Sequence, residues 1–328
     1  MKMNLSHLPR VPLIFLPTPI HPLPHLSKRL GGPTLWVKRD DQTGLATGGN
    51  KTRKLEYLVG DAVAQNADTL ITTGAPQSNH ARQTAAAAAH AGLKCALVLR
   101  GEPPADVAGN ILLDRLLGAD IVWAGKRSTD EVMNEVADEL RARGQRPYLI
   151  PLGGSNAVGA VGYAAAMQEF VEQARSLDLH FEAVVFATSS GGTQSGLVVG
   201  ARATGYTGRV LGISVDHPAD ECRQAFAPLA DATAARLELS LTFTPDDFDV
   251  SDSYLGAGYA IMGQPEREAI HLAAQCDALL VDPVYTGRAL AGLIDLIRKR
   301  EFRPGQNVLF WHTGGTPALF AYAQQLVG

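Results

Sequence analysis

Two hydrophobic spacings alternate along the chain from about Leu35 onward. Short apolar runs, typical of strands, separate stretches that place apolar residues at the i, i+3, i+4 spacing of a helix. In the first half, the runs that predict strands are Thr34–Lys38, Thr69–Gly74, Cys95–Leu99, Asp120–Ala124 and Pro147–Pro151. Helices are predicted through Leu55, Leu58, Val59, Ala62 and Val63, and over residues 78–91, 110–118 and 131–144. Ser128 and Glu131 have the spacing of a capping box before the last of these.

The second half repeats this rhythm. Strands are predicted at Ala183–Thr188, Val210–Asp216, Leu279–Asp282 and Asn307–Thr313. Helices are predicted after the glycine-rich turn that follows Thr188, after Gly287 and at Ala318. Strands that alternate with helices predict an α/β fold with mostly parallel sheets, covered by helices on both faces. The stretch Ala219–Asp252 has the least regular pattern, and we assign it no element.

The predicted strands fall into two sets. Those between Thr69 and Pro151 form one set of four, and those after Ala183 form another, to which Leu35–Lys38 could add an edge. We therefore expect a small α/β domain, residues 51–159, inserted between two parts of a large domain, residues 1–50 and 160–328. Prolines and histidines interrupt the apolar N-terminus, which predicts an extended arm and not a signal peptide.

Composition excludes several classes of protein. Hydrophobic residues make up 46% and charged residues 19%, which is too apolar for a disordered chain. No window of about 18 residues is apolar and uncharged, so we expect no membrane span. The net charge of −4 gives no basic surface for nucleic acid. The 3 cysteines form no CxxC pair and suit a reducing compartment, so we predict a cytoplasmic protein without a metal site.

Glycine is the unusual component. The chain has 33 glycines, above the usual share of about 7%, and many lie where predicted strands lead into helices. The carboxyl ends of strands in open α/β sheets are where such folds bind ligands. Five polar, glycine-containing turns stand at these places: Gly48–Lys54, Gly74–His80, Ser189–Gly196, Asp282–Gly287 and His312–Pro317.

The first turn carries a lysine at the start of a helix. Lys51, Arg53 and Lys54 place three cations in one helical turn, against the helix dipole, so they require an anionic partner or a function. A P-loop is a poor match because Asn50 separates Gly49 from Lys51. Lysine chemistry needs the neutral amine, and we expect Arg53 and Lys54 to help lower the pKa of Lys51.

The third turn predicts a phosphate site. Small residues, free amides and hydroxyls between a strand and a helix bind phosphate, and the absence of GxGxxG favours a single monoester over a dinucleotide. In the second turn, Ser78 or Asn79 is also a good N-cap for the helix that follows. A phosphate site beside a lysine indicates a phosphorylated cofactor that reacts with amines, and pyridoxal phosphate has that chemistry.

These motifs resemble the pyridoxal-phosphate enzymes of fold type II, the tryptophan synthase β-subunit superfamily. Within it, the chain is similar to the branch that contains D-cysteine desulfhydrase and 1-aminocyclopropane-1-carboxylate (ACC) deaminase. The resemblance runs from Pro17 to Phe320 and rests on KRDD (38–41), GGNKTRKLE (48–56), QSNHARQTAA (77–86), GGSN (153–156), DPVYTG (282–287) and HTGG (312–315). It implies two three-layer α/β domains with the cofactor between them, and a homodimer.

The resemblance also implies residue roles. Lys51 would form the imine with the cofactor, Ser78 would face the substrate and Asn79 would contact the cofactor ring. The remaining residues implied at the cofactor or the substrate are Asn50, Ser190, Gly191, Gly192, Thr193, Tyr259, Tyr285, Thr286 and Thr313. For Tyr259 the match is looser, and a buried tyrosine beside a glycine bend is the alternative.

Two threonines bear on the substrate. ACC deaminases of this branch are expected to have glutamate and leucine at the positions of Thr286 and Thr313. A threonine hydroxyl leaves the ring nitrogen neutral, and the weaker electron sink that results still suffices for β-elimination. We therefore predict a lyase that converts D-cysteine to pyruvate, hydrogen sulfide and ammonia. Lys51 would remove the α-proton, assisted by a tyrosine or Ser78.

Other activities stay open. L-cysteate sulfo-lyases share the segment at Thr43–Glu56 and would release sulfite, with Arg82, Arg288 or His80 as candidate sulfonate donors. ACC deamination is the next alternative activity after L-cysteate elimination. A nucleotide-binding α/β enzyme and a non-catalytic relative are the alternatives outside this class.

Overall fold

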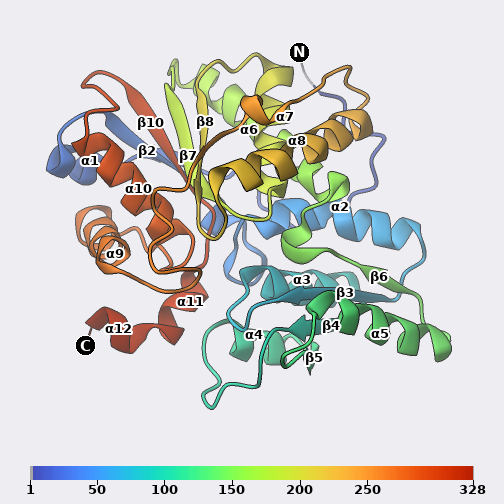
Figure 1. The fold of residues 1–328 in the computed structure, drawn as a ribbon. Coiled ribbons are helices and arrows are strands. Elements are labelled where there is room, and N and C mark those ends of the chain that lie inside the picture. The colour runs from blue at the N-terminus through green and yellow to red at the C-terminus, as the bar shows by residue number, and fades with distance from the viewer. Residues whose placement is uncertain (1–2, 328) are drawn as a thin grey trace.

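The computed structural model describes residues 3–327 and contains two separate sheets (Figure 1). The larger sheet has the strand order β1-β2-β10-β7-β8-β9, and the smaller has the order β5-β4-β3-β6. Strand β1 pairs antiparallel with β2, and the other pairs of neighbours are parallel. The larger sheet consists of β1 (Ile20–Pro22), β2 (Thr34–Arg39), β7 (Ala183–Thr188), β8 (Arg209–Ser214), β9 (Asp249–Ser251) and β10 (Asn307–His312). The smaller sheet consists of β3 (Thr69–Gly74), β4 (Lys94–Leu99), β5 (Asp120–Trp123) and β6 (Pro147–Leu149).

Helices cover both faces of the larger sheet. Successive residues of a strand point to opposite faces, so Val185 packs toward α1, α9 and α10 while Val184 and Phe186 pack toward α6 and α7. Helix α8 packs against α6 and α7 from outside. The helices are α1 (Pro24–Leu30), α6 (Ala157–Ser176), α7 (Gly192–Thr204), α8 (Ala219–Arg236), α9 (Gln264–Asp277) and α10 (Thr286–Arg298), followed by α11 (Thr316–Ala321) and α12 (Ala323–Val327).

The smaller sheet is built in the same way. Helices α2 (Lys51–Ala64) and α3 (Asn79–Ala91) bury leucine and alanine side chains against one face, and α5 (Thr129–Ala142) covers the other. Helix α4 (Asn110–Leu116) packs beside α3. Both units are therefore three-layer α/β structures, which confirms the predicted fold class. The boundaries proposed at residues 50/51 and 159/160 stay a prediction.

Three expectations about individual elements need correction. Leu279–Asp282 is not a strand, although Leu279 and Val281 are buried in the core beside α9 and α10. The apolar pattern of this segment arises because its side chains are buried, and a buried segment need not pair with a strand. The irregular stretch Ala219–Asp252 contains the 18-residue helix α8, and its pattern is weak because Pro228 and many alanines lie inside the helix. The first strand of the sequence pattern, β2, is also not an edge, because β1 pairs outside it.

Helix α6 joins the two units through a close contact with α2. A Cβ atom at Gly162 of α6 would lie 2.1 Å from the carbonyl oxygen of Arg53 in α2, so only glycine allows this approach. The helix that begins with Lys51 is thereby fixed against the helix layer of the larger sheet. None of the helices described is long and apolar enough to cross a bilayer.

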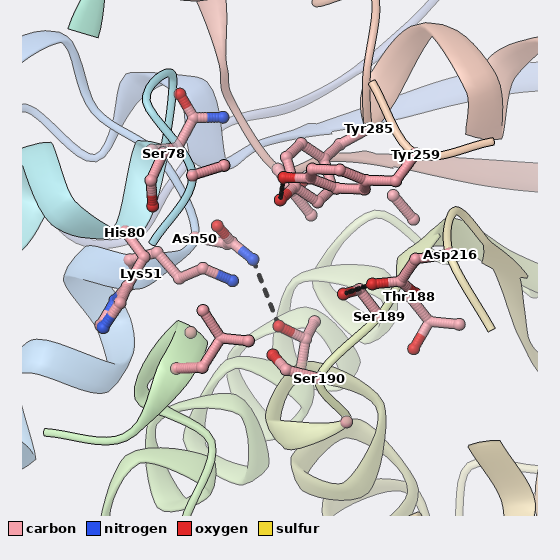
Figure 2. A pocket seen from close by; sticks show the side chains of 18 of the residues that line it. Asn50, Lys51, Ser78, His80, Thr188, Ser189, Ser190, Asp216, Tyr259 and Tyr285 are labelled. Carbon is pink, nitrogen blue, oxygen red and sulfur yellow. Dashed lines mark hydrogen bonds between the residues drawn. The ribbon is translucent and has the colours of Figure 1, made fainter. Parts of the chain in front are cut away.

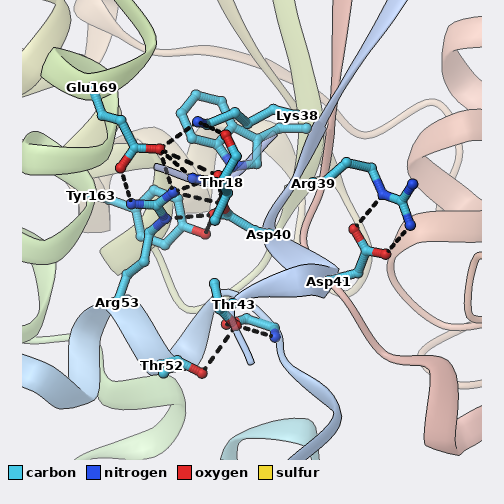
Figure 3. Close-up of polar contacts among 12 residues, drawn as sticks. Thr18, Lys38, Arg39, Asp40, Asp41, Thr43, Thr52, Arg53, Tyr163 and Glu169 are labelled. Atoms are coloured by element: carbon cyan, nitrogen blue, oxygen red, sulfur yellow. Dashed lines mark hydrogen bonds and ion pairs between the residues drawn. The ribbon is translucent and has the colours of Figure 1, made fainter. Parts of the chain in front are cut away.

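A buried cluster of charged and polar side chains lies beside this contact (Figure 3). Asp40, at the end of β2, accepts two hydrogen bonds of 2.8 Å from Arg53 and further bonds from Tyr163 (2.7 Å), Trp311 (2.8 Å) and Thr18 (3.0 Å). Burial would raise the pKa of the Asp40 carboxyl, but the charge and hydrogen bonds of Arg53 outweigh it and lower the pKa.

Glu169 of α6 completes the cluster. Its carboxylate pairs with Arg53 at 3.0 Å and with Lys38, whose ammonium also donates to the carbonyl of Thr18 at 2.8 Å. The cluster therefore joins the N-terminal arm, β2, α2, α6 and β10 in one place. Because a buried charge without its partner is costly, each of these segments is held in register by the others.

We predict that Asp40→Asn lowers the free energy of unfolding by about 3–5 kcal/mol, because it leaves Arg53 with an excess of buried positive charge. Urea unfolding monitored by far-ultraviolet circular dichroism measures this change. Asp138→Asn is the matched control, since Asp138 pairs with Arg141 on an exposed face of α5 and its loss is expected to change stability very little. Equal effects of the two substitutions would contradict the central role of the cluster.

Candidate active site

The five glycine-containing turns meet at one cavity of about 330 Å³ (Figure 2). This volume falls at the lower end of the range of about 300–1,000 Å³ that is usual for small-molecule sites. The turns after β3, β7 and β10 contribute, together with the start of α2 and the turn before α10. Of the residues that the sequence predicts, those that line the cavity are Asn50, Lys51, Ser78, Asn79, Ser190, Gly191, Thr193, Tyr259, Tyr285 and Thr313.

Lys51 is the first residue of α2, and its amine faces the cavity (Figure 2). Burial lowers the pKa of Lys51 to about 8, and the negative charge of Asp216 opposes part of this effect. An amine with this pKa has a substantial neutral fraction near neutral pH, which imine chemistry requires.

The expected cause of the low pKa was wrong. Arg53 points away from Lys51 into the cluster with Asp40 and Glu169, and the contact with Lys54 raises the pKa of Lys51. Burial is the main cause. The pKa of Lys54 itself lies well below its usual value, because that side chain is buried and lies beside the charge of Lys51.

Lys54 lies at the predicted phosphate site. Its side-chain nitrogen donates to the carbonyl of Gly153 at 3.0 Å and to the hydroxyl of Ser155 at 3.3 Å. A Cβ atom at Gly192, the first residue of α7, would lie 2.9 Å from the Lys54 nitrogen. A cation beside the N-terminus of a 13-residue helix is unfavourable unless an anion lies between them. A phosphate bound here would supply that anion and would let Lys54 carry its charge, so the site fits a phosphate group.

Side-chain hydroxyls also lie around the predicted phosphate site at the start of α7. The Ser155 and Ser190 hydroxyls lie 2.8 Å apart, and the Gly192 amide donates to Ser155 at 3.1 Å. The Asn50 side chain donates to the Thr193 hydroxyl at 3.2 Å, which connects the lysine turn to the start of α7. The group of Ser155, Ser190, Thr193 and Lys54 supplies the donors that a phosphate monoester needs.

Two tyrosines form the opposite wall of the cavity. The hydroxyls of Tyr259 and Tyr285 lie 2.6 Å apart, and their rings meet edge to face at 6.0 Å. Burial raises the pKa of both phenols, that of Tyr285 well above its usual value, so both stay protonated near neutral pH. The looser assignment of Tyr259 thus places it in the cavity with Tyr285.

Ser78 has both of the roles that the sequence leaves open for it. Its hydroxyl accepts the Ala81 amide at 3.1 Å as the N-cap of α3, and its side chain also lines the cavity. Thr313 lines the cavity as well. Thr286 and Gly192 are not among the lining residues: the Thr286 hydroxyl donates to the carboxylate of Asp282 at 2.7 Å, and the Gly192 amide is taken by Ser155.

Sequence reasoning missed several lining residues. Asp216, after β8, accepts a 2.6 Å hydrogen bond from Ser189, and its other carboxylate oxygen is buried without a partner among the described residues. Lys54, which lines the cavity, and Ser155, which lies behind it, belong to the GGNKTRKLE and GGSN motifs, but neither was assigned to the phosphate. Asp216 stands in no such motif, and only its position at the end of a predicted strand could have indicated it.

Of the three candidate sulfonate donors, one lines the cavity and two do not. Arg82 and Arg288 are fully buried and bind backbone carbonyls, so neither reaches the cavity. His80 lines the cavity, but burial and the charges of the two lysines hold its pKa well below the usual value. Its ring is therefore neutral near pH 7.

Comparison with known proteins agrees with this geometry. A family model described as pyridoxal-phosphate dependent enzyme matches residues 11–314. The chain is 43% identical to 1-aminocyclopropane-1-carboxylate deaminases of Burkholderia vietnamiensis and Burkholderia cenocepacia, with 98% of each chain covered.

Comparison with solved structures identifies the same fold. The crystal structure of an ACC deaminase homologue superposes with a TM-score of 0.90 at 37% identity, covering 98% of this chain and 97% of that one. Threonine deaminase isoform 2 of Solanum lycopersicum, at 16% identity and a TM-score of 0.68, covers 95% of this chain and 83% of its own, and shares the fold. The chain thus belongs to the fold type II family of pyridoxal-phosphate dependent enzymes, and its cofactor is pyridoxal phosphate.

Proposed function

We propose that this enzyme catalyses β-elimination on D-cysteine and releases hydrogen sulfide, pyruvate and ammonia. The observation that carries the proposal is the pair Thr286 and Thr313, which stand where the deaminases of this branch are expected to have glutamate and leucine. Thr313 lines the cavity, while Thr286 is hydrogen-bonded to Asp282. Neither position places a carboxylate at the ring of the cofactor.

The cofactor and the residues of the cavity would have different roles in this reaction. Bound pyridoxal phosphate supplies an aldehyde that combines with amines and a ring that accepts electrons. With the cofactor bound, Lys51 would hold that aldehyde, and its amine would accept the α-proton of the substrate. Its pKa of about 8 suits both tasks, because the amine takes up and gives up a proton near neutral pH.

The remaining side chains of the site would bind the cofactor phosphate and orient the substrate. Lys54, Ser155, Ser190 and Thr193 lie where they would hold the phosphate at the start of α7. Within the pair of Tyr259 and Tyr285, one phenol donates to the other, which leaves one O–H to donate to the substrate; Ser78 faces the substrate from the N-cap of α3. The homodimer that the resemblance implies and the cytoplasmic location that the cysteine content favours stay proposals.

ACC deamination is the second candidate, because the relatives with 43% identity carry that name. L-Cysteate elimination is the third. A sulfonate needs cationic donors, and of the arginines in the described part of the chain only Arg100 lines the cavity. The two buried arginines that could have bound it hold backbone carbonyls instead.

The three candidate activities are distinguished by the product that each substrate releases. We expect the purified enzyme to release sulfide from D-cysteine much faster than it releases sulfite from L-cysteate or ammonia from ACC. L-Cysteine is the control for the enantiomer. If ammonia release from ACC proceeds with the highest kcat/KM, the enzyme is a deaminase in spite of the two threonines.

We predict that Lys51→Ala lowers kcat for sulfide release by about 10³-fold or more, because it removes both the amine that holds the cofactor and the proton acceptor. The variant should also lose the visible absorption band of the holoenzyme. Lys94→Ala, at the exposed start of β4, is the matched control and should keep both properties. A Lys51→Ala enzyme with the normal band and normal turnover would refute the assignment.

The low pKa of Lys51 predicts a pH dependence in the cofactor-free protein. Because burial lowers the pKa to about 8, the neutral amine appears as the pH rises through 8, more than two units below an ordinary lysine at about 10.4. Pyridoxal, which lacks the phosphate, should attach to Lys51 at a rate that rises with a midpoint near pH 8. Borohydride trapping followed by peptide mass spectrometry measures this, and a midpoint near 10 would contradict it.

A further inference from the structure

The loop that leads to Lys51 has an unusual backbone. Ala46 and Thr47 have φ angles of 41° and 70°, and Gly48 and Gly49 follow at 67° and 130°. Left-handed conformations are rare for alanine and rarer still for a β-branched residue such as threonine. Such a run persists only where surrounding groups hold it in place.

Arg82 of α3 holds this loop from inside the protein. Its side chain is fully buried, and its guanidinium donates to the carbonyls of Ala46 and Gly48, the second at 3.1 Å. Its Nε donates in the other direction, to the side-chain oxygen of Asn110 at 2.8 Å. Arg82 thus connects the lysine loop to the first residue of α4.

Asn110 is fully buried and uses every polar atom of its amide. The Oδ1 atom accepts from Arg82, and Nδ2 donates to the carbonyl of Gln77 and to Oδ1 of Asn79, both at 2.9 Å. The Asn110 amide nitrogen of the backbone also donates to the Gln77 side chain at 2.8 Å. Asn110 therefore binds the turn that carries Ser78 and Asn79.

These contacts fix the direction of each amide. A guanidinium only donates and a backbone carbonyl only accepts, so Asn110 has one orientation, with its oxygen toward Arg82. Its NH₂ group then faces the oxygen of Asn79, whose own NH₂ group is left for the cavity that Asn79 lines. Asn79 consequently presents a hydrogen-bond donor to whatever occupies the cavity.

We propose that Arg82 and Asn110 are positioning residues: they hold the Asn79 amide with its NH₂ group toward the cavity, where it would donate to the phenolic oxygen of the cofactor ring, and they hold the Lys51 loop in its strained conformation. The proposal rests on the contact between Asn79 and the cofactor ring that the resemblance implies, and it is independent of which amino acid is the substrate. Asn110 is the residue that joins the two turns, because it contacts both Arg82 and Asn79.

The test uses Asn110→Asp in the holoenzyme. A carboxylate still accepts from Arg82, but it has no proton to donate to Asn79 or Gln77, so the Asn79 amide loses its fixed direction. A donor stabilises the anionic form of the ring oxygen. We therefore expect the affinity for pyridoxal phosphate to fall about tenfold, and the pH midpoint of the visible absorption change to rise by about one unit.

A double-mutant cycle separates positioning from a merely structural role. If Asn110 acts through Asn79, Asn79→Ala produces the same shift, and adding Asn110→Asp to Asn79→Ala changes the midpoint no further. Additive shifts, or an unchanged midpoint in Asn110→Asp, would overturn the proposal. Should the buried carboxylate prevent folding, Asn110→Ala introduces no charge and gives the same cycle.

Asn307→Asp is the matched control. Asn307, at the start of β10, also donates to a backbone carbonyl, that of His180, and accepts from a side-chain donor, Trp36. It is not among the residues that line the cavity. The same chemical change there is expected to leave the cofactor affinity and the absorption midpoint unchanged, and cofactor measurements of this kind do not depend on D-cysteine turnover.

Discussion

The buried pair of Asp40 and Arg53 is the interaction on which the arrangement of the active site depends. Three basic residues in the first turn of α2 oppose the helix dipole, and the structure directs each of them to a different place. Arg53 pairs with Asp40 and Glu169 on one side of the helix. Lys54 points to the phosphate position at the start of α7, and Lys51 faces the cavity. Because Arg53 has its own counter-charges, its charge is satisfied before any ligand binds, and the two lysines are free for the cofactor.

Buried arginines perform a second task in this protein. The turns that carry active-site residues do not belong to the sheet ladders, so their carbonyls need other donors. Arg82 supplies them for the loop before Lys51. Arg288 donates to the carbonyls of Val215, Gly258 and Ile261, which flank Asp216 and Tyr259. A guanidinium has five donors in a rigid plane, so one side chain satisfies several carbonyls and holds an irregular turn to the core.

Sequence alone predicted the α/β class, most strands and the residues around the cavity, because burial and glycine-rich strand ends leave clear patterns. It failed where a pattern has two explanations. Leu279–Asp282 has the apolar run of a strand but packs without pairing, and α8 lacks a clear apolar stripe because Pro228 and alanines occupy it. Asp216, Arg82 and Asn110 act through contacts between segments distant in the chain, and no local pattern reports a contact of that kind.

At the start of α10, the negative charge of Asp282 is taken up by hydrogen bonds within the turn. Asp282 accepts the backbone amides of Val284, Tyr285 and Thr286 as well as the Thr286 hydroxyl, all within 2.9 Å. Its carboxylate therefore serves to begin the helix and to fix the backbone of Tyr285. A threonine at 286 is short enough to join these bonds, and its hydroxyl proton is used in doing so. Thr313 lines the cavity as a neutral side chain while Thr286 stays bound to Asp282, so neither threonine adds a negative charge to the cavity.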